Sequence, residues 1–75
     1  MQKNITVLDV EFKITLIQDE NLEYELFVTA VDDPNCEFDT RFQHLPSDGD
    51  IEEYIISMES SMPEGIAESM FGVKY

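Results

Sequence analysis

Hydrophobic and polar residues alternate along much of the first half of the chain. From Leu8 to Leu16 every second residue is apolar and the residues between are polar, so this segment predicts a half-buried strand over residues 5–17. The polar residues 18–21 favour a turn, and the alternation returns over residues 22–31. These two runs predict an antiparallel β-hairpin.

The pairing of these two strands follows from their faces. A shift of one residue would turn the apolar face of a strand outward, so even-numbered residues must lie opposite even-numbered residues. Pairing of Leu16 with Leu22 meets this condition and places Lys13 opposite Glu25. We therefore expect both apolar rows on one side of the sheet and most of the charge on the other.

A third strand is predicted after a second turn. Residues 32–35 contain two aspartates, a proline and an asparagine, a composition that favours a turn. A weaker apolar row then predicts a strand over residues 36–43. Pro46 ends the strand region, because proline lacks the N–H group that a strand ladder needs.

Apolar residues recur with a helical period in the second half of the chain. They predict a helix over residues 50–61, and Asp50 with Glu53 has the spacing of a capping box at its start. The apolar stripe consists of Ile51, Tyr54, Ile55, Met58 and Met62.

A second, shorter helix is predicted over residues 63–71. Pro63 interrupts the first helix and opens the second, and Gly72 ends it. We expect residues 73–75 to form a tail or a short extended piece. Met58, Met62 and Met70 lie on the apolar stripes and are read as core residues, with an exposed, adaptable methionine surface as the alternative.

These elements predict one α+β domain over residues 1–75. A three-stranded antiparallel sheet forms one layer, and two C-terminal helices cover its even-numbered face, in the order β-β-β-α-α. The 43% apolar content, with five phenylalanines and three tyrosines, exceeds what disordered segments carry. Because the chain has one cysteine, no intramolecular disulfide can form, and we expect packing alone to stabilise the fold.

The charge of the chain is strongly one-sided. Seventeen acidic and four basic residues give a formal net charge of −13 at pH 7. Direct binding to nucleic acid is not expected, because its phosphates would be repelled. A charged exterior built only for solubility is one interpretation, but such surfaces mix both signs and carry a net charge of roughly 2 to 8. The imbalance favours an anionic docking face for a basic partner.

We expect the partner-binding residues on the face of the sheet that the helices leave open. The acids predicted there are Asp9, Glu11, Glu23, Glu25, Glu37 and Asp39, and Glu52 with Glu53 forms a second patch on the first helix. Val7, Ile17 and Phe27 interrupt the polarity of this face. Scattered surface apolar residues are the ordinary explanation, and the functional one is that Phe27 is an aromatic anchor surrounded by charge.

Candidate catalytic and metal-binding residues do not form a recognisable pattern. Cys36 as a nucleophile would need a base beside it, and nothing in the spacing places His44 there. Asp48-Gly49-Asp50 lacks the spacing of a calcium loop. We expect no catalytic residues, no metal and no cofactor, and hence no enzyme.

Three functions remain open. The first is a non-enzymatic inhibitor of a basic, nucleic-acid-binding protein or complex, acting as a nucleic-acid mimic. The second is an antitoxin or immunity-type protein, and the third is a homo-oligomeric structural protein that pairs through its first strand. No signal peptide or membrane-spanning run is evident, so we expect a monomer or homodimer in the cytoplasm, with no membrane partner.

Two resemblances concern the order of elements. A short acidic antiparallel sheet followed by helices resembles the small phage-encoded inhibitors of the anti-CRISPR kind, which implies a role in evading antiviral defence in the cytoplasm of the host cell. The segments 33–36 and 47–53 are also similar in place to the turn and the acidic helix start of HicB-type antitoxins. The glycine pattern of that family and its DNA-binding segment are missing here.

Overall fold

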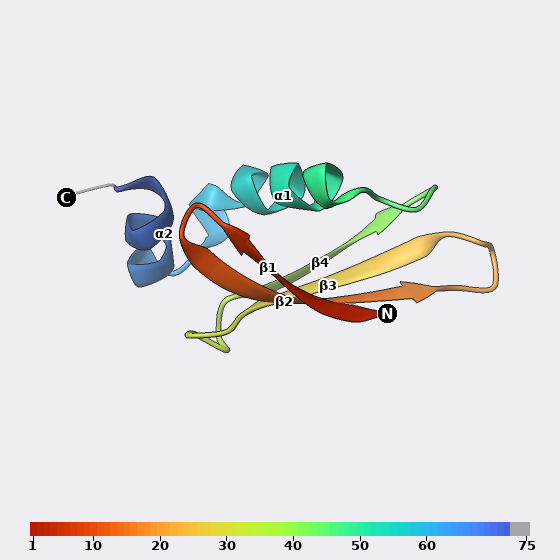
Figure 1. Cartoon of the computed structure of the whole chain (residues 1–75), viewed down its shortest axis with the longest axis horizontal. Coiled ribbons are helices and arrows are strands. Elements are labelled where there is room, and N and C mark those ends of the chain that lie inside the picture. Colours follow the sequence, from red (N-terminus) through yellow and green to blue (C-terminus); the bar gives the residue numbers. More distant parts are fainter. Residues whose placement is uncertain (73–75) are drawn as a thin grey trace.

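Four strands form one antiparallel sheet, and a helix lies over one of its faces (Figure 1). The structure is a computed structural model that describes residues 1–72, so the predicted tail at 73–75 lies outside the described residues. The strands are β1 (Gln2–Val7), β2 (Val10–Gln18), β3 (Tyr24–Ala30) and β4 (Glu37–Phe42). The helical segments are α1 (Asp48–Ser57), the short 3-10 turn η1 (Glu59–Ser61) and α2 (Glu64–Phe71).

The α+β class, the antiparallel sheet and the two C-terminal helices are confirmed. The expectation of three strands is wrong, because the sheet has four, in the order β1-β2-β3-β4. The molecule is elongated, with extents of 44 × 18 × 17 Å. Helix α1 lies over the sheet, and α2 lies at the end of the molecule near the β1–β2 turn (Figure 1).

The additional strand arises because the predicted strand over 5–17 contains a turn. Leu8 and Asp9 have φ values of 48° and 69°, as in the two-residue turns that join tight hairpins. Val7 and Val10 are therefore partners across β1 and β2, and both are buried. The inward-facing positions are odd in β1 and even in β2, so Val7 belongs to the core rather than to the acidic face.

The register of β2 against β3 also differs from the prediction. Leu16 lies opposite Leu26 rather than Leu22, and Lys13 lies opposite Thr29 rather than Glu25. The shift is four residues, so even-numbered residues still face even-numbered ones and the apolar face is preserved. The cause is the β2–β3 loop, which ends later than predicted.

This loop is closed by main-chain and carboxylate hydrogen bonds around Asp19. The amide of Asp19 donates to the carbonyl of Glu23 at 2.9 Å, and its carboxylate accepts from the amides of Asn21 and Glu23. Leu22 has a φ of 65°, the left-handed conformation usual at the last position of a three-residue hairpin loop. Glu23 therefore belongs to the loop and not to a strand.

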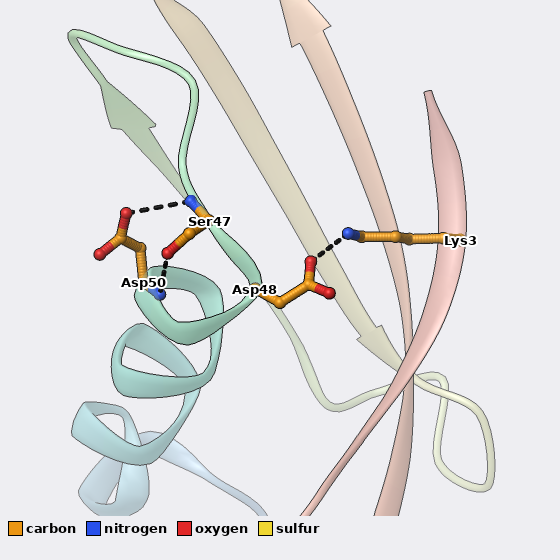
Figure 2. Close-up of polar contacts among 4 residues, drawn as sticks. All are labelled: Lys3, Ser47, Asp48 and Asp50. Carbon is orange, nitrogen blue, oxygen red and sulfur yellow. Dashed lines mark hydrogen bonds and ion pairs between the residues drawn. The ribbon is translucent and has the colours of Figure 1, made fainter.

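Helix α1 begins earlier and ends earlier than predicted. Ser47, rather than Asp50, is its N-cap: the Ser47 hydroxyl accepts from the amide of Asp50, and the Asp50 carboxylate accepts from the amide of Ser47 (Figure 2). The capping box therefore pairs Ser47 with Asp50, and not Asp50 with Glu53. The helix ends at Ser57 and the chain continues as η1.

The second helix follows the prediction closely. Pro63 is the N-cap residue of α2, and Gly72 ends it in the left-handed conformation, with its amide donating to the carbonyl of Glu68. One contiguous core joins the sheet to both helices. Its largest fully buried side chains are Phe12, Ile14, Leu26, Ile51, Ile55, Val7, Val28 and Cys36.

Methionines contribute to the same core. Met62 and Met70 are buried, and Met58 packs against the core from a half-buried position. The expectation of core methionines is therefore confirmed.

None of the described helices has the length and apolarity needed to cross a membrane.

Candidate protein-interaction surface

The face of the sheet away from the helices is here called the open face. Cross-strand partners share a face, so its members follow from the pairing of the four strands. They are Gln2, Asn4 and Thr6 on β1; Glu11, Lys13, Thr15 and Ile17 on β2; Glu25, Phe27 and Thr29 on β3; and Glu37, Asp39 and Arg41 on β4.

The open face carries four of the six acids predicted for it. Those four are Glu11, Glu25, Glu37 and Asp39. Asp9 lies in the β1–β2 turn because the first predicted strand contains that turn, and Glu23 lies in the β2–β3 loop because the second predicted strand begins later than expected. Two cations, Lys13 and Arg41, lie among the acids. The open face is therefore mixed in charge, with four acids and two cations on its strands.

An aromatic side chain lies at the centre of the acidic part of this face. Phe27 on β3 is 38% exposed, with Thr15 opposite it on β2 and Asp39 opposite it on β4. A shallow hollow of about 290 Å³ runs along this part of the β3–β4 pair. Its lining residues are Phe27, Val28, Thr29, Glu37, Phe38 and Asp39.

Three carboxylates surround this aromatic ring at adjacent positions. Asp39 is the direct partner of Phe27, Glu37 lies two residues along the same strand, and Glu25 lies two residues along β3. Same-face neighbours on a strand are about 6.7 Å apart, and neighbouring strands are about 4.8 Å apart. We call Phe27, Glu25, Glu37 and Asp39 the Phe27 cluster.

The nearest cation to the cluster is held elsewhere. Arg41 lies opposite Glu25, but its guanidinium Nη1 lies 3.5 Å from the Asp19 carboxylate in the β2–β3 loop. Among residues 1–72, neither Glu37 nor Asp39 forms an ion pair. Their carboxylates are therefore available to a cation from outside the molecule.

The opposite end of the open face is more nearly neutral. The Asn4 amide nitrogen donates to the Glu11 carboxylate at 2.7 Å, and Lys13 lies two residues further along β2. Glu11 is therefore separated from the Phe27 cluster by a cation and by neutral side chains. The structure groups Glu25, Phe27, Glu37 and Asp39 and leaves Glu11 apart.

The helical layer, on the other side of the molecule, is more uniformly acidic than the open face. Glu52 and Glu53 are exposed on α1, as predicted for a second patch. The segment 48–71 contains seven acids and neither lysine nor arginine. They are Asp48, Asp50, Glu52, Glu53, Glu59, Glu64 and Glu68.

Most of the helical acids were not predicted as candidate residues. The signal was available in the sequence, since neither lysine nor arginine occurs between Arg41 and Lys74. Among residues 1–72, one helical acid forms an ion pair: Asp48 at the start of α1 pairs with Lys3 of β1 (Figure 2). A second hollow of about 540 Å³ lies where η1 meets α2 and is lined by Glu59, Ser60, Met62, Glu64 and Ala67.

The residues considered for catalysis lie apart from this surface. Cys36 is buried, and its burial, together with the negative charge of Asp33, raises the pKa of its thiol. A raised pKa disfavours the thiolate, which is the reactive form. His44 is exposed in the loop after β4. Within residues 1–72, no group of three or more histidine, cysteine, aspartate or glutamate side chains could hold a metal ion.

No protein-family model, curated protein or solved structure matches this chain.

Proposed function

We propose that this protein is a non-enzymatic inhibitor that binds a basic, nucleic-acid-handling protein. Its contact surface is the part of the open face centred on the Phe27 cluster. The observation that carries the proposal is the exposed ring of Phe27 in a hollow flanked by Glu37 and Asp39, two carboxylates with no ion pair within residues 1–72.

The chemistry of this cluster fits an arginine or lysine side chain of the partner. The face of an aromatic ring attracts a cation, and adjacent carboxylates can accept its hydrogen bonds. Arginine fits better than lysine, because its planar guanidinium can stack on Phe27 while donating to Asp39. Buried aromatic anchors ringed by polar groups dominate the energetics of many protein interfaces.

The remaining charge of the molecule acts at longer range. A net charge of −13, with seven acids on the helical segment, attracts a basic protein and raises the rate of association. A groove that binds phosphates is such a basic surface, and carboxylates seated in it would compete with DNA or RNA. This is the way in which an anti-CRISPR-like nucleic-acid mimic would act in the cytoplasm of an infected cell.

Affinity capture with paired variants tests the proposal. The intact protein serves as bait, and the bound proteins are compared with those held by Phe27→Ala and by the double variant Glu37→Lys/Asp39→Lys. The control is Glu52→Lys/Glu53→Lys, which changes the net charge equally but lies on α1. We expect the open-face variants to lose the partner and the control to keep it with slower association.

Affinity measurements on the captured partner then quantify the contact. Phe27→Ala should weaken binding by about 30-fold or more, as for an interface anchor worth about 2 kcal/mol. Ile17→Ala, an exposed apolar residue of the same face outside the cluster, should have little effect. Binding that is insensitive to salt, or that is lost only in the α1 control, would refute the proposed surface.

A further inference from the structure

We propose that the free edge of β1 pairs antiparallel with β1 of a second copy of this chain, joining two sheets into one continuous sheet. This inference is independent of the proposed function, since it concerns the edge of the sheet and not the Phe27 cluster. It follows from the direction in which the main-chain N–H and C=O groups of β1 point, from the charge of its surroundings and from a comparison with the other edge.

The pattern of hydrogen bonds between β1 and β2 shows which main-chain N–H and C=O groups of β1 point away from β2. Met1 and Leu16 exchange two main-chain hydrogen bonds, at 2.8 and 3.0 Å, so they form a hydrogen-bonded pair. Such pairs alternate along an antiparallel ladder, so the next ones on β1 are at Lys3, Ile5 and Val7. The N–H and C=O groups of the residues between them point away from β2. Those residues are Gln2, Asn4 and Thr6, and all three are exposed.

This edge is the least acidic part of the molecule. Residues 1–8 contain no aspartate or glutamate and include Lys3 and the terminal ammonium group. Two copies that each carry a charge of −13 repel one another, so a contact is least unfavourable where acids are fewest. A meeting of two β1 edges places the acid-free segments together. The acids bonded to β1 side chains are Asp48, which is paired with Lys3, and Glu11, which accepts from the Asn4 amide.

The usual protection of an exposed edge is missing from β1. Edge strands are commonly blunted by proline, by a bulge or by a charged side chain directed inward. Gln2, Asn4 and Thr6 are neutral, and β1 pairs with β2 without a bulge. Lys3 does lie on the inner face, but its ammonium is held by Asp48 of α1 and does not project past the edge (Figure 2).

The other edge of the sheet is protected. Ala30 donates to the carbonyl of Cys36, so the main-chain groups of Glu37, Asp39 and Arg41 point outward from β4. These residues are all charged, and the hydroxyl of Tyr54 already occupies the carbonyl of Asp39. The β4 edge therefore resists pairing, whereas the β1 edge permits it.

The geometry of the paired edges follows from their symmetry. Two identical strands that pair antiparallel are related by a two-fold axis. When this axis passes through Asn4, the outward N–H and C=O groups of Gln2, Asn4 and Thr6 lie opposite those of the second copy. Asn4 then faces Asn4 of the second copy, and Gln2 faces Thr6 of the second copy. This arrangement makes roughly six new main-chain hydrogen bonds.

Sedimentation equilibrium at increasing protein concentration tests the pairing. We expect a monomer–dimer equilibrium that shifts toward dimer as salt is raised, because salt screens the repulsion between the two anionic copies. Binding to a basic partner has the opposite salt dependence, because salt weakens the attraction between opposite charges. A failure of this inference can therefore be distinguished from a failure of the proposed function. A monomer at all concentrations and salt levels would overturn this inference.

Substitution at Asn4 tests the site of contact. Asn4→Pro removes an outward N–H without removing a ladder bond, so the fold should be retained and the dimer lost. Asn4→Lys places two ammonium groups opposite each other and should also abolish the dimer, while keeping a partner for Glu11. Asn4→Ala is the matched control that leaves the main-chain edge intact. A dimer that survives both Asn4→Pro and Asn4→Lys would place the contact elsewhere.

Disulfide trapping gives a second, independent readout. Residues of a hydrogen-bonded antiparallel pair have Cα atoms about 5.5 Å apart, within the range that a disulfide spans. In a Cys36→Ala background, Asn4→Cys should form a covalent dimer under mild oxidation much faster than Asn35→Cys, which is also exposed but lies in a loop. Equal rates for the two variants would contradict pairing about Asn4.

Discussion

Tyr54 on α1 donates its hydroxyl hydrogen to the main-chain carbonyl of Asp39 on β4, at an oxygen–oxygen distance of 2.9 Å. The same ring packs edge-on against Phe38, with centroids 6.2 Å apart and an interplanar angle of 87°. One side chain thus fixes the helix to the sheet through both a polar and an aromatic contact. It also holds the strand that carries Glu37 and Asp39 in the Phe27 cluster.

Removal of this hydroxyl should weaken the fold modestly. Tyr54→Phe keeps the aromatic contact with Phe38 and loses the hydrogen bond to Asp39, so we expect the free energy of unfolding to fall by about 0.5 to 1.5 kcal/mol. Urea denaturation followed by circular dichroism measures this change. Tyr24→Phe, at a half-buried tyrosine of β3, is the control, and an equal loss there would show that the Asp39 contact contributes nothing specific.

The same tyrosine makes stability depend on alkaline pH. Burial, and then the negative charge of Asp39, raises the pKa of Tyr54 above its ordinary value of about 10. The unfolded chain therefore loses this proton first, and the contribution of Tyr54 to stability is lost as pH rises above about 10. Urea denaturation across that range should show a steeper decline for the native protein than for Tyr54→Phe. Parallel declines would contradict the raised pKa.

The capping box at the start of α1 should contribute measurably to stability. Ser47→Ala removes the hydroxyl that accepts from the Asp50 amide, and loss of such an N-cap costs about 1 kcal/mol. Ser60→Ala, at an exposed serine of η1, should have almost no effect. Thermal unfolding of both variants beside the native protein measures the difference, and similar melting temperatures for the two would argue against the cap.

The carboxylate of the same box gives a pH dependence at the acidic end. Hydrogen bonds from the main chain and side chain of Ser47 lower the pKa of Asp50 below its ordinary value. The contribution of Asp50 is therefore present above pH of about 4 and is lost as pH falls through its lowered pKa. The stability difference between the native protein and Asp50→Asn should shrink across that range. A difference that is constant with pH would show that the carboxylate charge has no role.

Relief of backbone strain at Leu22 should stabilise the protein. Leu22 has a positive φ and is 70% exposed, so its side chain adds little packing to offset an unfavourable conformation. Asparagine tolerates this conformation, and we expect Leu22→Asn to raise the free energy of unfolding by roughly 0.5 to 1 kcal/mol. Leu45→Asn, at another exposed leucine without a positive φ, should give no gain, and an equal gain there would point to general surface polarity instead.

The thiol of Cys36 should be protected in the folded state. Its burial and raised pKa predict that a thiol reagent at neutral pH reacts only when the chain unfolds. Labelling should therefore accelerate sharply through the urea transition. In a Cys36→Ala background, Asn35→Cys should react at once in native buffer, and an equally fast reaction of native Cys36 would contradict its burial.

Periodicity predicted the class of fold but not the first turn. The alternation from Leu8 to Leu16 runs through the turn without a break, and Leu8 is a residue that rarely adopts a positive φ. A two-residue turn keeps Val7 and Val10 on the same face, so the inward positions change from odd to even. A sign of this change in the sequence is Val7, an apolar residue at an odd position where a polar residue was expected. The bounds of the second helix were predicted more accurately. Proline favours the start of a helix and glycine its end, and Pro63 and Gly72 occupy these positions in α2.

The candidate site was predicted in part for a similar reason. Glu25, Phe27, Glu37 and Asp39 were placed correctly on the open face, since the side-chain period of a strand does not depend on register. Which residues are neighbours does depend on register and loop length, and these were set by the Asp19 carboxylate and by Leu22, whose roles no local pattern indicates. The pairing of Arg41 with Asp19 was beyond prediction for the same reason.

The order of the strands in the sheet is the order of the strands in the chain. Each strand therefore finds its partner by closing one short loop, and folding does not wait for distant segments to meet. During synthesis the whole sheet emerges before the helices, so its apolar face is bare until α1 and α2 follow. We expect rapid folding of the complete chain and aggregation of any fragment that stops before residue 48.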